Sequence, residues 1–219
     1  MCDLHGHAGA LPPLPADDYV LDTPIVRDFV AAVRRCIERA ATPRDACDLI
    51  RPGFANLLAR PDWLPERYQE QAEESGMGNG IGQWLLFRAA DRSLCLFSLV
   101  VPPGAMTPVH DHLAWGLVGL YRGNQDEEFY RPAAGRLETL RRRPLSPGDL
   151  YALLPPRDDV HRVRTTSAVT SVSIHLLASD TGCVVRHTFD EETGEARPFR
   201  SGYVNAACHD EGEPARARR

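Results

Sequence analysis

From about residue 82 onward, the chain is a succession of short apolar segments separated by turn residues. The segments span 84–87, 93–101, 115–121, 127–130, 136–140, 150–154, 160–164, 169–177 and 183–189. The turns between them include Pro-Gly, Arg-Gly-Asn, Ala-Gly, Ser-Pro-Gly-Asp and Glu-Thr-Gly-Glu. Many short strands at regular spacing are typical of an antiparallel barrel or sandwich. The sequence therefore predicts a mainly β fold, with a barrel over about 82–190.

The part of the chain before residue 82 has the periodicity of helices instead. Thr23-Pro24 places a proline in the first turn of a helix. Apolar residues then recur every four positions, at Ile25, Phe29, Val33 and Ile37. A second helix is predicted from Thr42-Pro43 to about Leu58, and a short third helix over 62–74. The helical segment as a whole spans about 24–74.

The length of 219 residues fits one domain. We expect a loose lead-in over 1–22, a single domain over 23–205 and a disordered tail over 206–219. A net charge of −5 argues against a general nucleic-acid or anionic-membrane binder. No apolar run approaches the roughly 20 residues that span a bilayer. The sequence does not fix the oligomeric state.

The cysteines suggest a compartment for the protein. The six residues are scattered without a Cys-x-x-Cys pair, at Cys2, Cys36, Cys47, Cys95, Cys183 and Cys208. In a chain of this size that pattern predicts reduced thiols in a cytosolic protein. Cys95 and Cys183 lie in apolar segments, where a packing role is expected. The N-terminus lacks the basic and apolar regions of a signal peptide, so we expect a cytoplasmic location.

The segment from Gly104 to His112 ends in His110-Asp111-His112. Residues i and i+2 of an extended strand point to the same face, so the two histidines can offer two imidazole nitrogens to one metal ion. The spacing resembles the cupin pattern of glycine, five residues, His-x-His, three or four residues, glutamate, six residues and glycine. Gly123 matches the last position, but Gly116 stands where the glutamate ligand is expected.

The second half of the cupin pattern implies a third metal ligand. Its histidine follows a glycine, a strand and a proline-bearing turn, and His161 stands at that place after Pro155–Asp159. Three neutral imidazoles leave coordination positions open for anionic ligands or water. Such a set suits Zn(II), and imidazole also suits Fe, Cu and Ni. The resemblance predicts a cupin double-stranded β-helix barrel with an N-terminal helical segment.

Polar residues near the predicted metal suggest further chemistry. Alternation in 169–177 places Ser173 and His175 on one face of a strand. If that face looks inward, the two form a hydrogen-bonded pair that orients a ligand or relays a proton. The alternative is a structural pair without chemistry. An inward Arg186 needs an anion, for which a substrate carboxylate is suitable; a surface arginine is the alternative.

The chain resembles the bacterial thiol dioxygenases of the cysteine dioxygenase family, and within it the 3-mercaptopropionate branch. The resemblance covers roughly Ile25 to Asn205. It is carried by Thr107-Pro108-Val109-His110-Asp111-His112-x-x-Trp115-Gly116, Ser173-Ile174-His175, and Arg186-His187-x-Phe189-Asp190. It implies that three histidines bind Fe(II) and that O₂ converts a small thiol, such as 3-mercaptopropionate or cysteine, to its sulfinate.

The resemblance also implies roles for individual residues. The iron ligands are His110, His112 and His161, and Ser173 with His175 form the catalytic pair. Arg186 holds the substrate carboxylate, and Trp115 and Leu177 lie on the substrate side.

Two positions depart from the family pattern. The family's catalytic tyrosine falls on Leu177, and the cysteine of the animal-type cysteine–tyrosine crosslink falls on Leu117. Either activity persists without that phenol or the pocket takes a bulkier thiol. A phenol from elsewhere is a further option, with Tyr68, Tyr121, Tyr130 and Tyr151 as candidates. Other functions left open are a different metal-dependent cupin enzyme, such as a zinc hydrolase or a carbon–carbon-cleaving iron dioxygenase, and a non-catalytic ligand-binding cupin.

Overall fold

The computed structural model describes residues 12–73, 75–133 and 135–208. Of the expected lead-in, residues 1–11 lie outside this range, and so do residues 209–219 of the expected tail. Within the described part of the lead-in, strand β1 (Asp18–Tyr19) pairs with Arg88 and Phe87. This short pairing was not predicted. Among the described residues, no helix is both long and apolar enough to traverse a lipid bilayer.

Two predicted helices are confirmed. Helix α1 spans Pro24–Arg39 and helix α2 spans Pro43–Leu58. A threonine hydroxyl caps each one, because Thr23 and Thr42 accept hydrogen bonds from the backbone three residues further on. Proline follows each threonine, at the helix position where a missing N–H costs nothing. The buried side of α1 is its apolar stripe of Val26, Phe29, Val30 and Val33.

The third predicted helix, over 62–74, is wrong. Across the described residues 62–73, the helical structure is a single 3₁₀ turn, η1 (Glu66–Tyr68). Asp62 has a φ of 57°, which a continuing right-handed helix does not allow. The segment instead packs through Trp63, Leu64 and Tyr68, all buried, and the Tyr68 hydroxyl donates to the Val20 carbonyl. A few separate buried side chains thus hold this segment in place, instead of the continuous apolar stripe of a packed helix.

Every predicted strand segment is present, with shifted ends. The strands are β2 (Gly82–Arg88), β3 (Cys95–Val101), β4 (Gly116–Arg122), β5 (Gln125–Ala133), β6 (Arg136–Leu145), β7 (Leu150–Leu153), β8 (His161–Thr165), β9 (Ser171–Leu177), β10 (Arg186–Phe189) and β11 (Ala196–Phe199). Strand β11 was not predicted; it pairs with β10 to close a hairpin.

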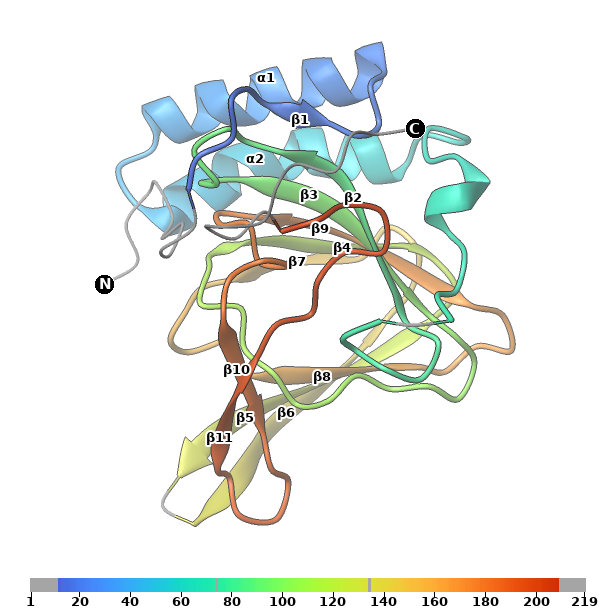
Figure 1. Ribbon diagram of the computed structural model, residues 1–219, viewed down its shortest axis with the longest axis vertical. Helices are drawn as coiled ribbons and strands as arrows, with labels where there is room; N and C mark the ends of the chain where they lie inside the picture. The colour runs from blue at the N-terminus through green and yellow to red at the C-terminus, as the bar shows by residue number, and fades with distance from the viewer. Residues whose placement is uncertain (1–11, 74, 134, 209–219) are drawn as a thin grey trace.

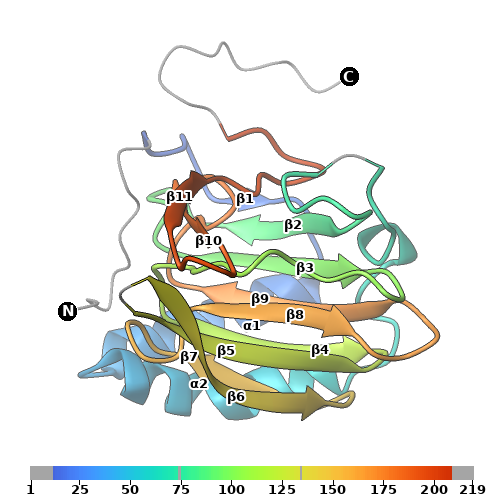
Figure 2. The ribbon, with the colours of Figure 1, turned by 90° about the horizontal axis from the view of Figure 1, so that it is seen from below.

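The strands form two facing sheets. The larger has the order β1-β2-β3-β9-β4-β7, and the smaller has the order β6-β5-β8. Figure 1 shows both helices lying on the outer face of the larger sheet, and Figure 2, seen from below, shows the smaller sheet in front of the larger one. The segment 106–110 pairs with β8 on one edge and with β10 on the other, so it extends the smaller sheet to the β10–β11 hairpin.

The strand order identifies the architecture. The barrel has eight strands when they are numbered along the chain from β3 to β9 and segment 106–110 is counted as the second. In this numbering, β3, β9, β4 and β7 of the larger sheet are the first, eighth, third and sixth strands. The smaller sheet joins the second, seventh, fourth and fifth. This is the order of a double-sheet jelly roll, the architecture of cupins. The expected fold, a mainly β cupin barrel with N-terminal helices, is confirmed.

Two apolar layers pack on opposite sides of the larger sheet. Val172, Ile174 and Leu176 of β9 belong to the layer beneath the helices, whereas Leu177 belongs to the barrel interior. The alternation of strand side chains produces this division. Helix α2 approaches β4 closely at Gly119, where an added Cβ would lie 3.0 Å from the Phe54 ring. A side chain at that position would have to displace the side chains of Leu58 and Phe54, which pack between the helix and the sheet.

The cysteines differ from the prediction. Cys183 and Cys208 form a disulfide, with their Cα atoms 5.1 Å apart and a sequence separation of 25. The fold brings them together, because Arg88 and Arg92 donate to the carbonyls of Ala207 and Cys208. The expectation that all cysteines are reduced is therefore wrong, and the cytoplasmic location loses that support. Cys95 is a buried free thiol, as expected.

We expect Phe54→Ala to lower the free energy of unfolding by about 3–5 kcal/mol, because it opens a cavity between α2 and the sheet. Phe54 is fully buried. Leu49→Ala, on an exposed position of the same helix, is the control and should change stability by about 0.5 kcal/mol or less. Urea unfolding monitored by circular dichroism measures both. Similar losses in the two variants would contradict the described packing of α2.

Candidate metal centre

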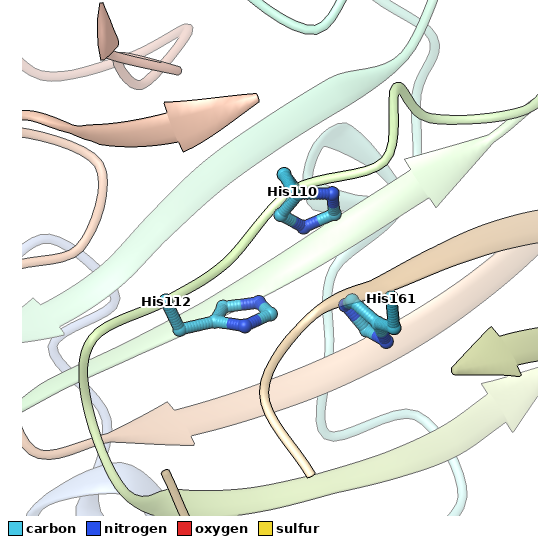
Figure 3. Close-up of side chains that lie close together, drawn as sticks. All are labelled: His110, His112 and His161. Atoms are coloured by element: carbon cyan, nitrogen blue, oxygen red, sulfur yellow. The ribbon is translucent and has the colours of Figure 1, made fainter. Parts of the chain in front are cut away.

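Three buried histidines come together inside the barrel. His110 and His112 lie between β3 and β4, and His161 begins β8. Their ring centroids are 4.8–4.9 Å apart, and each offers a ligand nitrogen within 4.8 Å of the others. Figure 3 shows the rings converging from two separate stretches of the chain. The three predicted metal ligands thus form one cluster, which could hold a metal ion.

Backbone pairing fixes this convergence. His110 and His161 exchange two hydrogen bonds, with N···O distances of 3.0 and 2.9 Å. Residues that face each other in such a pair project their side chains to the same side of the sheet. His112 lies two residues beyond His110 and returns to that side. The register of this backbone pairing and the two-residue spacing of His110 and His112 therefore bring the three imidazoles together.

Each imidazole has its Nδ1 atom beside a protein oxygen. These oxygens are the Pro108 carbonyl 2.9 Å from His110, the Asp159 carboxylate 3.2 Å from His112, and the Glu127 carboxylate 2.7 Å from His161. With Nδ1 so placed, Nε2 is left to face a ligand. The Nε2 atom of His161 is buried and has no hydrogen-bond partner in the described structure.

The electrostatics of the cluster suit a metal. Burial lowers the pKa values of His110 and His112 well below the usual range, and the nearby His161 and Arg186 add to the effect. The imidazoles of His110 and His112 are therefore neutral, the form that binds metals. Neutral nitrogen donors with an unsatisfied buried Nε2 fit a divalent transition metal of the zinc or iron type.

Asp111 and Asp159 hold the backbone around the cluster. The Asp111 carboxylate accepts hydrogen bonds from the backbone N–H and the ring Nδ1 of His187, both at 2.7 Å. This attaches the ligand segment to β10. The Asp159 carboxylate accepts from the backbone N–H groups of His112 and Leu113, at 2.8 and 3.0 Å. Leu113 has a φ of 54°, so the chain turns sharply there.

Ser173 and His175 form the expected hydrogen-bonded pair. The Ser173 Oγ atom lies 3.0 Å from His175 Nε2, and both residues are buried in the barrel. The His175 ring stacks on Phe97 and lies 6.3 Å, centroid to centroid, from the His112 ring. Burial lowers the pKa of His175 well below its usual value. A neutral imidazole therefore stands beside the cluster, with a buried Nδ1 that has no partner among the described residues.

Arg186 is buried, which rules out the surface-arginine alternative. Its guanidinium donates to the carbonyls of Thr181 and Asp111, at 3.2 and 2.6 Å, and to the Ser201 hydroxyl at 2.8 Å. Within the described part of the chain, no carboxylate lies at ion-pair distance from it. Burial lowers its pKa to about 10. A buried guanidinium with neutral partners is suited to bind an anion.

The two remaining predicted residues lie on different sides of the larger sheet. Leu177 is fully buried in the barrel interior. Trp115 packs in the apolar layer beneath the helices, so the structure does not bring it together with the histidines. Of the tyrosines considered as sources of a phenol, Tyr151 is the one beside the cluster, with its hydroxyl 3.4 Å from His161 Nδ1.

Sequence reasoning missed Glu127 and Asp159. Both are buried polar residues, yet Glu127 lies in the acidic stretch Asp126-Glu127-Glu128 and Asp159 in a polar turn. Such surroundings indicate solvent-exposed residues. One signal in the sequence could have indicated that Glu127 is buried. It lies two residues before the apolar Phe129 in β5, so both side chains point to the same, inward face.

No family model matches the chain. Solved structures with partial likeness include Peruvianin-I, a cysteine peptidase from Thevetia peruviana latex, at 20% identity over 55% of this chain and 78% of that one, with a TM-score of 0.37. An oxalate oxidase matches at 15% identity over 42% and 45%, with a TM-score of 0.35. A cupin 2 domain-containing protein from Halorhodospira halophila matches at 18% identity over 49% and 58%, with a TM-score of 0.30.

This chain thus spans less than half of the oxalate oxidase and little more than half of the cupin 2 protein. At these identities and TM-scores, the fold assignment rests on the strand order alone.

We expect His112→Ala to lose bound metal, because two imidazoles hold a divalent ion far less tightly than three. Plasma mass spectrometry of protein loaded anaerobically with Fe(II) and then desalted measures the metal content. His175→Ala is the matched control, since it removes a buried imidazole outside the cluster and should retain metal. Metal loss in both variants, or in neither, would contradict the assignment of the ligands.

Proposed function

We propose that the chain is an Fe(II)-dependent dioxygenase that converts a small thiol carboxylate to its sulfinate. The supporting observation is a buried three-histidine cluster beside the Ser173–His175 pair and a buried Arg186 with no carboxylate partner among the described residues. In the reaction R–SH + O₂ → R–SO₂H, both oxygen atoms reach the sulfur. The sulfur supplies all four electrons, so no further reductant is needed.

His110, His112 and His161 would hold the iron. Bound Fe(II) supplies the redox chemistry with O₂ and favours the thiolate form of the substrate, as metal ions do for coordinated thiols. Gly116 contributes no carboxylate, so the protein ligands are all neutral and leave room for the substrate's sulfur.

Arg186 would select the substrate by its carboxylate. Its guanidinium donates to the carbonyl of Asp111, the residue between His110 and His112, so its charge lies close to two of the histidines. A planar guanidinium can bind a carboxylate through two parallel hydrogen bonds. Such a contact would set the orientation of a short thiol acid between Arg186 and the histidines.

Ser173 and His175 would handle a proton near the reacting sulfur. The neutral His175 imidazole donates or accepts at Nε2 toward Ser173, and its Nδ1 has no partner among the described residues. A neutral imidazole in this position can hold the thiol proton during binding. Leu177 adds an apolar wall where the family has a tyrosine, and Tyr151 is the nearby phenol. A bulkier thiol remains an alternative substrate for this pocket.

The direct test is O₂ uptake by the Fe(II)-loaded protein across a panel of small thiols, with the sulfinate identified by mass spectrometry. We expect uptake with 3-mercaptopropionate or cysteine and a product heavier than the thiol by the mass of two oxygen atoms. Zinc-loaded protein is the control and should be inactive. Stoichiometric zinc in protein purified without added metal, together with thiol-independent hydrolysis, would favour a hydrolase instead.

Arg186→Ala should chiefly raise the KM for thiol carboxylates, because it removes the charge that binds the carboxylate. We expect kcat/KM to fall about 30-fold or more, which is about 2 kcal/mol. An uncharged thiol such as 2-mercaptoethanol is the internal control, since its slower turnover should not depend on Arg186. An unchanged KM for carboxylate thiols would show that Arg186 is not the anchor. Equal losses for both kinds of thiol would indicate a structural role.

A further inference from the structure

Packing excludes a side chain at Gly116, where the cupin pattern has a glutamate ligand. A Cβ atom at this position would contact the Leu176 carbonyl oxygen and lie 2.9 Å from the Leu177 Cα atom. Both neighbours include backbone of β9, which pairs with β4 at this position. Since backbone cannot rotate away as a side chain can, the barrel leaves no room for a carboxylate ligand at this position.

Two other carboxylates are buried at the cluster. Glu127 is fully buried and Asp159 is 3% exposed. Within the described residues, the ion pairs of both are with histidines of the cluster, and neither pairs with an arginine. Asp159 accepts hydrogen bonds from two backbone N–H groups, whereas neither carboxylate oxygen of Glu127 has a hydrogen-bond partner among the described residues. A buried carboxylate is unfavourable without a nearby positive charge.

We infer that Glu127 and Asp159 carry the counter-charge of the metal centre, in place of the glutamate that Gly116 cannot provide. They act through His161 and His112, whose Nδ1 atoms they face, and are therefore positioning residues. Two carboxylates match the charge of one divalent ion. The inference rests on the proposed metal centre but not on the thiol chemistry proposed for it.

The contacts explain how these carboxylates strengthen metal binding. A carboxylate beside Nδ1 fixes the proton on that nitrogen, aims Nε2 at the metal and makes the imidazole a stronger donor. His110 differs, because its Nδ1 faces the neutral Pro108 carbonyl. The negative charge is thus placed behind two of the three ligands. This leaves the coordination positions themselves free for neutral or anionic molecules.

The test is the affinity of the apoprotein for Co(II) and Zn(II), measured by competition with a chromophoric chelator. Glu127→Gln keeps the shape of the side chain and removes its charge. We expect it to bind both metals 10- to 100-fold more weakly, the usual effect of losing an outer-shell carboxylate. The matched control is Glu128→Gln, the next residue on β5, which faces Arg142 and Arg162 instead of the histidines. It should bind metal as the wild type does.

Thermal unfolding distinguishes a charge role from a structural one. Glu127→Gln should leave the Tm of the apoprotein unchanged or raised, and should reduce the rise in Tm that saturating Zn(II) produces. Asp159→Asn should also weaken metal binding. A lowered apoprotein Tm with an unchanged rise on adding Zn(II) would overturn the inference, and so would equal metal affinities in the Glu127→Gln and Glu128→Gln variants.

The same measurements separate this inference from the proposed function. A wild-type protein that binds no metal would overturn both. A wild-type protein that binds metal, loses affinity in Glu127→Gln and oxidises no thiol would support the charge assignment and refute the thiol reaction.

Discussion

The antiparallel pairing of segment 106–110 with β8 is the interaction on which the candidate site depends. Its two hydrogen bonds between His110 and His161 bring together residues that are far apart in the sequence. The opposite edge of the same segment pairs with β10, which carries Arg186. One short stretch of backbone thus connects the metal ligands to the residue proposed to bind the substrate. The Asp111 carboxylate reinforces this connection through His187.

Burial determines the electrostatics of the candidate site. The barrel removes the histidines from water, so their neutral forms are favoured, and it removes Arg186 and two carboxylates from water as well. Groups of both signs are then held within a small volume where charges interact strongly. The acids lie beside the Nδ1 atoms of His112 and His161, and the guanidinium donates to the Asp111 carbonyl. A dication and an anionic substrate would each find a fixed partner of opposite charge.

The sequence was informative where the signal is local and periodic. Alternation predicted the strands, the Thr-Pro pairs predicted both helix starts, and the His-x-His spacing predicted two ligands. The errors arose where contacts between segments distant in sequence determine a residue's environment. The Cys183–Cys208 bridge and the carboxylate of Glu127 beside His161 exist only after folding. Trp115 precedes β4, and sequence alone does not show on which side of a sheet such a residue packs.

The two-sided packing of β9 affects how this chain can change over evolution. The strand lies between β3 and β4, and its alternate residues serve the helix layer and the barrel interior. Apolar residues beneath the helices can therefore be exchanged for others of similar size without disturbing Ser173 or His175. An insertion or deletion of one residue in β9 would instead reverse the two faces and place the imidazole among the helices. We therefore expect related chains to vary in composition along this strand while keeping its length.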